Sequence, residues 1–305
     1  MPHLHRISCL LLASLLVACA SESSSRKIEN AAPDEYVAIR DEVPEPIGKF
    51  LADLDLSIRA WTNLTMTARS EEDERKAREL AAVLERETNR RRDELVAELA
   101  SGPARNRQRA AAALGFTGDP TVLGPLLAAL EDRDPDVVHN AALGLALLGS
   151  AETPTETLTA LLADHPDPQT RSMAAYALCS VVEAGADPTP LLPTVRMSLT
   201  DSAPGVRMQC ALIAGMAGDP DSVQALADLL HDEQVLVRLA AIEALVQLGK
   251  RTGEVKGTAA RALVDAWRDA DRSMRSHLRE GMVRLAGEDL GDEEERWVRW
   301  SRNLP

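Results

Sequence analysis

The chain has 305 residues, of which 45% are apolar and 3% aromatic, and it carries a formal net charge of −14 from 34 basic and 48 acidic side chains. Alanine and leucine supply most of the apolar side chains, a composition that favours helices over sheets. Nucleic acids and anionic lipid surfaces both attract proteins through basic surface charge. The acidic balance therefore argues against both kinds of partner.

The first eighteen residues, 1–18, have the pattern of a cleaved signal peptide. Arg6 supplies a positive charge, and residues 7–18 are nearly all apolar but too few to span a bilayer. The run Leu-Val-Ala-Cys at 16–19 resembles the bacterial lipobox, in which a small residue precedes the cysteine that receives a lipid before cleavage. This resemblance implies a bacterial lipoprotein that begins at Cys19 and carries covalent lipid there, palmitate included, with no other cofactor. An ordinary signal peptide with an incidental cysteine is the alternative.

Residues 19–46 are expected to form a flexible polar tether. Serines follow the cysteine, and three prolines interrupt any helix. Several acyl chains on one cysteine anchor a protein stably where a single chain does not. By the same family resemblance, Ala20 after the cysteine implies sorting to the outer membrane, facing the periplasm, in a Gram-negative host.

Residues 47–101 predict an N-terminal helical hairpin. An amphipathic pattern covers Ile47 to Met66, and Ser70 with Asp73 has the spacing of a helix start. A charged helix is expected to follow as far as about Leu99. The sequence leaves open whether this hairpin caps the rest of the fold or projects from it.

Residues 102–287 repeat one pattern at intervals of 31–37 residues. An arginine, or Val138 in the second unit, is followed by small apolar residues and then by leucine, methionine or isoleucine; the aligned positions are 107, 138, 171, 207, 238 and 275. Asp-Pro turns mark helix starts, because proline fits the first turn of a helix and breaks its interior. Each unit therefore holds two helices. The first helices of the pairs are expected at 121–131, 154–163, 189–199, 221–230 and 258–268.

The tandem pattern resembles the HEAT repeats, in particular the short variety also found in phycobilin lyases. The resemblance implies an all-α fold, an α-solenoid of about six HEAT-type helix pairs. The solenoid needs caps at both ends, which we assign to the N-terminal hairpin and to a short capping helix within residues 288–305. Trp297 and Trp300 share one face of that helix, as a cap or as an aromatic docking site.

The family also places an aspartate about six residues before the arginine. Four units have both residues: Asp164 and Arg171, Asp201 and Arg207, Asp232 and Arg238, Asp269 and Arg275. A pair that recurs in every layer is structural rather than catalytic, with the guanidinium joining carboxylate and carbonyl groups between repeats. Ser101 and Val138 depart from the pattern. From them we expect weaker coupling at the first and second repeats.

No motif for catalysis or metal binding stands out, and we expect neither catalytic residues nor a metal site. The histidines lack zinc-ligand spacing, and no nucleophile elbow or phosphate-binding loop is present in the sequence. Cys179 and Cys210 are interpreted as small buried apolar side chains. The sequence therefore predicts a binding protein and not an enzyme.

In solenoids of this type the second helices line the concave face. Five side chains between the alanines predict an apolar, partner-binding strip there: Leu143, Met173, Tyr176, Met208 and Leu212. Packing of the same side chains against neighbouring repeats is an equal alternative. The later repeats place Glu243, His277 and Glu280 on this face.

These patterns predict a membrane-anchored scaffold for a protein or peptide partner, with no nucleic acid bound. A permanent structural subunit of a cell-envelope complex is an alternative that differs only in the lifetime of the interaction. A phycobilin-lyase-like enzyme is a further alternative, carried by the repeat resemblance alone, and a shared fold does not establish a shared function.

Overall fold

The computed structural model describes residues 45–68 and 70–305, and every regular element in them is a helix. The prediction of an all-α fold is therefore confirmed. The predicted signal peptide, the lipidation site Cys19 and nearly all of the tether lie outside the described residues.

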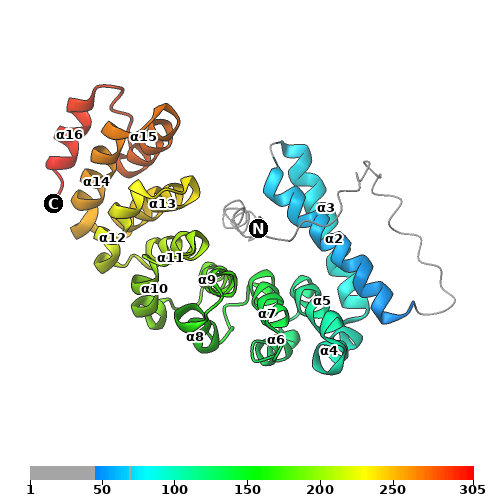
Figure 1. The fold of residues 1–305 in the computed structure, drawn as a ribbon. Helices are drawn as coiled ribbons and strands as arrows, with labels where there is room; N and C mark the ends of the chain where they lie inside the picture. The colour runs from blue at the N-terminus through cyan, green and yellow to red at the C-terminus, as the bar shows by residue number, and fades with distance from the viewer. Residues whose placement is uncertain (1–44, 69) are drawn as a thin grey trace.

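Six helix pairs stack into a C-shaped arc in the described part of the chain (Figure 1). The first helices are α4 (Arg92–Ser101), α6 (Leu123–Ala129), α8 (Glu156–Asp164), α10 (Leu192–Ser198), α12 (Val223–Asp228) and α14 (Lys256–Asp269). The second helices are α5 (Ala104–Leu114), α7 (Pro135–Leu148), α9 (Pro168–Glu183), α11 (Pro204–Ala217), α13 (Val235–Arg251) and α15 (Arg272–Ala286). The second helices form the inner row of the arc, and each packs against its neighbours in that row.

Second helices such as α7 and α9 begin at Asp-Pro turns, as the sequence predicts. The Asp134 carboxylate accepts the backbone N–H of Asp136, and the Asp167 carboxylate accepts that of Thr170. In both helices proline occupies the first turn, where its missing N–H is not needed. Short 3₁₀ turns such as Pro120–Val122 lead into several first helices, which lie where the sequence places them.

Glycine lets neighbouring second helices approach closely. A Cβ atom added to Gly144 of α7 would lie 2.4 Å from the carbonyl oxygen of Ala111 in α5. A Cβ atom on Gly215 of α11 would lie 2.5 Å from the Cα atom of Ala244 in α13. Each glycine therefore meets the backbone of an adjacent layer, the preceding one for Gly144 and the following one for Gly215, and no larger side chain fits without moving a helix.

The N-terminal hairpin consists of α2 (Ile47–Thr67) and α3 (Glu71–Arg90). The expected single helix from Ser70 to about Leu99 is wrong, because Arg91 leaves the helical region with φ −122° and ψ 24°. The Arg91 guanidinium lies 4.4 Å from the centre of the Phe50 ring and pairs with Glu94. Helix α4 beyond the break packs against α5, so the first repeat begins at residue 92, and the predicted boundary at 101 divides a helix pair.

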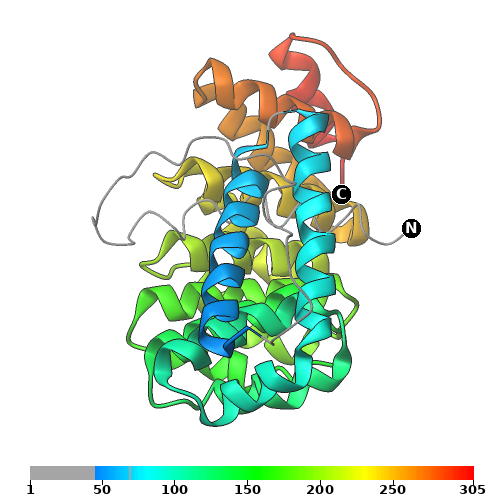
Figure 2. The same ribbon diagram turned by 90° about the vertical axis from the view of Figure 1, so that its right-hand side faces the viewer.

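The hairpin both caps the stack and projects from it. Its base covers α5, with Leu51 and Leu54 buried and Trp61 in edge-to-face contact with Phe116 at 5.0 Å. The Asn89 side chain also donates a 2.8 Å hydrogen bond to the carbonyl of Thr117. The C-terminal end of α2 and the N-terminal end of α3 extend beyond α5 in both views (Figures 1 and 2).

Helix α16 (Glu294–Arg302) closes the other end by packing against α14. Trp297 is fully buried, and its indole N–H donates to the carbonyl of Gly291 at 2.8 Å. Trp300 is half-buried and meets Trp297 edge-to-face at 5.5 Å. The tryptophan pair therefore belongs to the cap.

Two glycine substitutions test the close packing of the arc. Gly144→Ala is expected to lower the free energy of unfolding by about 1–3 kcal/mol, because its new methyl group overlaps the α5 backbone. In Gly124→Ala of α6 the new methyl group meets no atom within 4 Å, and the free energy of unfolding is expected to rise by up to about 1 kcal/mol through helix propensity. Urea unfolding measures the free energy of unfolding of both variants. Equal effects in the two variants would show that the contact at Gly144 relaxes without cost.

Candidate functional site

An arginine ladder joins successive layers along one edge of the solenoid. Three arginines each give two nitrogens to the aspartate of the following repeat, at 2.7–2.9 Å: Arg107 to Asp132, Arg171 to Asp201, and Arg207 to Asp232. The remaining nitrogen of each guanidinium donates to a backbone carbonyl just before its own helix, such as that of Gly102. Each guanidinium thus fixes one turn to the next.

The other predicted ladder residues do not complete this pattern in the described structure. Arg238 donates to the carbonyl of Asp232 at 2.6 Å and makes no described bond to a carboxylate. Arg275 donates to the carbonyl of Arg268 at 2.8 Å and lies over the Trp267 ring. Asp164 and Asp269 are exposed at the ends of their helices.

The structure does not show the weaker coupling that the sequence predicts at the first repeat. Arg107 makes the full two-nitrogen contact with Asp132, so the first and second layers are joined despite Ser101. The interruption lies one layer later, because Val138 is buried where an arginine would reach Asp164. Ser101 is the last residue of α4, and α3, the helix before α4, supplies no ladder arginine that could pair with an aspartate at this position.

The ladder sets the protonation of its carboxylates. The hydrogen bond from Arg107 lowers the pKa of Asp132 despite partial burial, which opposes the shift. Burial acts to raise the pKa of Asp201, but hydrogen bonds from Arg171 and from the Ala203 amide outweigh it and the pKa is lowered. The pKa of Asp232 is lowered by the same balance of opposing effects.

The predicted apolar strip on the concave face is largely covered. Met173, Tyr176, Met208 and Leu212 are at most 6% exposed and belong to the continuous hydrophobic core, so their predicted exposure is wrong. Leu143 alone is half-exposed. Because the second helices approach one another closely, these side chains pack against neighbouring repeats, which is the alternative that the sequence left open.

The structure brings the polar inner-face residues of the last two repeats together. A cavity of about 200 Å³ between α13 and α15 is lined by Leu239, Ile242, Glu243, His277, Glu280 and Arg284. Arg284 donates to the Glu243 carboxylate at 2.7 Å across the seam between the two helices. The inner face therefore opens to solvent at this end of the arc.

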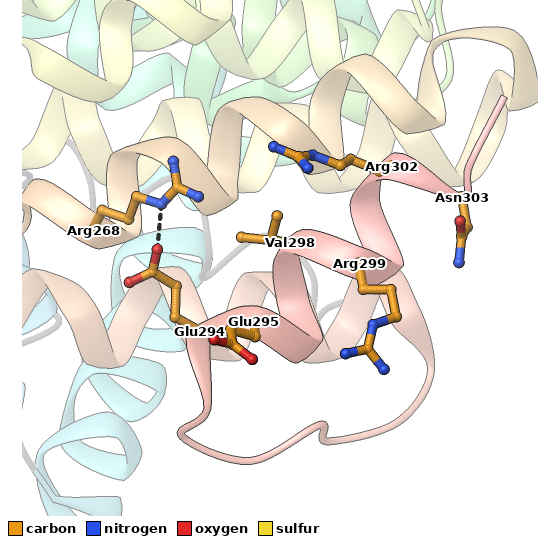
Figure 3. A pocket seen from close by; sticks show the side chains of 7 residues that line it. All are labelled: Arg268, Glu294, Glu295, Val298, Arg299, Arg302 and Asn303. Carbon is orange, nitrogen blue, oxygen red and sulfur yellow. Dashed lines mark hydrogen bonds and ion pairs between the residues drawn. The ribbon is translucent and has the colours of Figure 1, made fainter.

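A second cavity, of about 450 Å³, lies between α14 and α16 and was not predicted. Its lining residues are Arg268, Glu294, Glu295, Val298, Arg299, Arg302 and Asn303 (Figure 3). Arg268 donates to Glu294 at 2.6 Å, so side chains of both signs face the space. Such a mixed rim around one apolar side chain has the character of a solvated helix face.

The described residues hold no group of three or more histidine, cysteine or acidic side chains placed to bind a metal ion. Cys179 and Cys210 are buried and are not joined to each other by a disulfide, and burial raises the pKa of the Cys210 thiol above its ordinary range. A thiol in that state is a poor nucleophile.

Comparison with known proteins places the repeats in one sequence family. A family model described as HEAT repeats matches residues 92–179, 155–246 and 192–283. No curated protein matches the chain. The first matched residue coincides with the start of α4.

Solved structures similar to this one are also repeat solenoids. The karyopherin Kap121p is 17% identical with a TM-score of 0.57, and the match covers 81% of this chain and 29% of that protein. Kap121p bound to the SUMO protease Ulp1p is 15% identical with a TM-score of 0.57, over 83% of this chain and 30% of that one. At these identities the likeness establishes the fold alone.

Removal of a ladder arginine is expected to destabilise the stack. Arg207→Met leaves the partly buried Asp232 without its guanidinium and should lower the free energy of unfolding by about 2–4 kcal/mol. Arg238→Met, which loses carbonyl contacts only, should cost about half as much. Urea unfolding of the two variants compares them. Equal losses would mean that the carboxylate contact adds nothing.

The lowered aspartate pKa values predict acid sensitivity. A carboxylate with a folded pKa below its unfolded value of about 3.9 stabilises the fold above that value, and this stabilisation is lost as the pH falls through the folded pKa. Unfolding temperatures should therefore drop between pH 5 and pH 2.5. Asp201→Asn should have a lower unfolding temperature than the wild type at pH 5, and its unfolding temperature should fall by less between pH 5 and pH 2.5. A parallel decline in both proteins would exclude Asp201 as a contributor to the acid sensitivity.

Proposed function

The chain belongs to the HEAT-repeat family, and from this premise we propose that it is a membrane-anchored scaffold that binds a protein or peptide partner on the concave face of its solenoid. The observation that supports this most is the continuous inner row of second helices from α5 to α15, which curves around one open side (Figure 1). Inner surfaces of stacked repeats are extended binding surfaces because each layer adds a few contact positions.

The membrane anchor is supported by the sequence at 16–19 and by the polar tether that follows it. We place the lipid on Cys19 and the protein in the bacterial cell envelope, at the outer membrane and facing the periplasm. Among the described residues, no helix combines the length and the apolar character needed to cross a bilayer.

The inner face offers two kinds of contact to a partner. Leu143 of α7 is half-exposed, and the cavity between α13 and α15 presents charged and imidazole groups at Glu243, Glu280 and His277. An apolar contact with a polar rim is the usual composition of a protein interface. The burial of both cysteines and the structural role of the ladder favour binding over catalysis.

Loss of the anchor should change location and leave the fold intact. Cys19→Ser is expected to abolish palmitate labelling and to move the protein from the membrane fraction to the soluble fraction, because the thiol is the acceptor of the lipid. Cys179→Ser, at a buried thiol, serves as the matched control and should keep both properties. Palmitate labelling of the Cys19→Ser protein would contradict lipidation at this site.

Capture of a partner from detergent-solubilised envelopes tests the scaffold. Leu143→Arg and Glu280→Arg place new charge on the inner face, whereas Met197→Arg places it on α10 of the outer row, at a side chain that is 68% exposed. The wild type and Met197→Arg are expected to capture the same protein, and the inner-face variants at least tenfold less, with circular dichroism confirming the fold of each.

Two other outcomes would count against this function. Equal capture by all variants would exclude the concave face, and the absence of a specific protein in every sample would exclude the scaffold. Fixed stoichiometry through repeated washing would identify a permanent subunit of a complex; salt-sensitive, sub-stoichiometric capture would identify a transient partner.

A further inference from the structure

The outer face of α2 in the N-terminal hairpin carries a large apolar side chain that is exposed. Helix α2 packs chiefly against α3 and α5, and Leu51, Leu54 and Ile58 on its inner side are buried. Leu56 lies on the opposite side and is 60% exposed, and no other large apolar side chain in the described part of the hairpin is exposed. Figure 2 shows α2 and α3 side by side in front of the repeats, so this end of the arc is open to a second molecule.

The residues around Leu56 are arranged symmetrically along this face. Ala52 and Ala60 lie four residues before and after it, one helical turn away on each side. Asp53 and Arg59 lie three residues before and after it and carry opposite charges. Ala52 is half-buried, and the other three side chains are exposed. Each direction along the helix therefore presents one small residue and one charge, and the sign of the charge reverses across Leu56.

This pattern is complementary to itself when two copies of the helix pack antiparallel. With a two-fold axis beside Leu56, the two leucines would face each other, and Asp53 of either copy would face Arg59 of the other. Ala52 would likewise face Ala60, and small side chains at these positions let two helix axes approach to about 8 Å. A parallel arrangement would instead place like charges opposite each other at positions 53 and 59.

The charged groups on this face are available to a second molecule. Asp53 is exposed and takes part in no ion pair within residues 45–68 and 70–305. The Arg59 guanidinium lies 3.2 Å from Asp55, but the Arg59 side chain is 74% exposed, and Asp55 also lies 3.7 Å from Arg109. Arg59 can therefore turn to a new carboxylate while Asp55 keeps a cation beside it. Exposed ion pairs are weak, so this exchange costs little.

We propose that two copies of this protein associate through α2, packed antiparallel around a two-fold axis beside Leu56. A contact confined to one helix of each copy is smaller than the roughly 1,200–2,000 Å² of a stable complex, so the association is weak in dilute solution. Attachment of both copies to one membrane would raise their effective concentration, and the dimer would offer two concave faces to one partner. The contact lies outside the six repeats, so it does not depend on what the concave face binds.

Disulfide trapping in oxidised cell envelopes tests the contact at its axis. In the antiparallel dimer the thiols introduced by Leu56→Cys face each other, with Cα atoms within the roughly 4.4–6.8 Å that a disulfide requires. Leu56→Cys in the full-length chain should therefore give a disulfide-linked dimer. Met197→Cys, at the 68% exposed position of α10, is the matched control and should stay monomeric like the wild type. No dimer from Leu56→Cys, or equal cross-linking of the two variants, would overturn the inference.

Exchange of the two charges tests the register. Asp53→Arg alone and Arg59→Asp alone each place like charges opposite one another, and each should weaken self-association of the full-length chain about tenfold in sedimentation equilibrium. The double variant Asp53→Arg, Arg59→Asp restores opposite charges and should associate as the wild type does, with circular dichroism showing that all three variants keep their helices. A wild type that sediments as a monomer at every concentration, or a double variant no better than the single ones, would overturn the inference.

Discussion

The close approach of neighbouring second helices is the constraint on which the rest of this structure depends. Glycine at 144 and 215 lets one helix backbone touch the next, and buried alanines such as Ala111 and Ala244 fill the same contacts. A row packed this tightly leaves little free surface between layers. It draws large side chains, including Tyr176 and Leu212, into the hydrophobic core. The burial of these side chains follows from this spacing.

Repetition explains how much of the fold was predictable from the sequence. The Asp-Pro turns and the recurring alanines fixed the positions of the helix pairs, because each signal occurs in several layers. The break at Arg91 was not predictable in this way. It has no proline or glycine, and its contacts with Phe50 and Glu94 form only after the hairpin folds back. Local sequence patterns therefore predicted the repeated helix pairs. The break at Arg91, which occurs once, depends on tertiary contacts that these patterns do not contain.

The candidate site was predictable to a smaller extent. Helical register correctly assigned Glu243, His277 and Glu280 to one surface, but the exposure of a side chain also depends on the distance between helices, which the pattern does not contain.

Interruption of the arginine ladder divides the solenoid into blocks of unequal cooperativity. Stability in repeat proteins is a sum of terms within repeats and between nearest neighbours. The contacts of Arg171 and Arg207 join the third, fourth and fifth layers. The junction before this block has Val138 in place of the arginine, and at the junction after it Arg238 binds backbone carbonyls only. Under load or heat the stack should therefore open at one of these two junctions first, and the central block would remain intact longest.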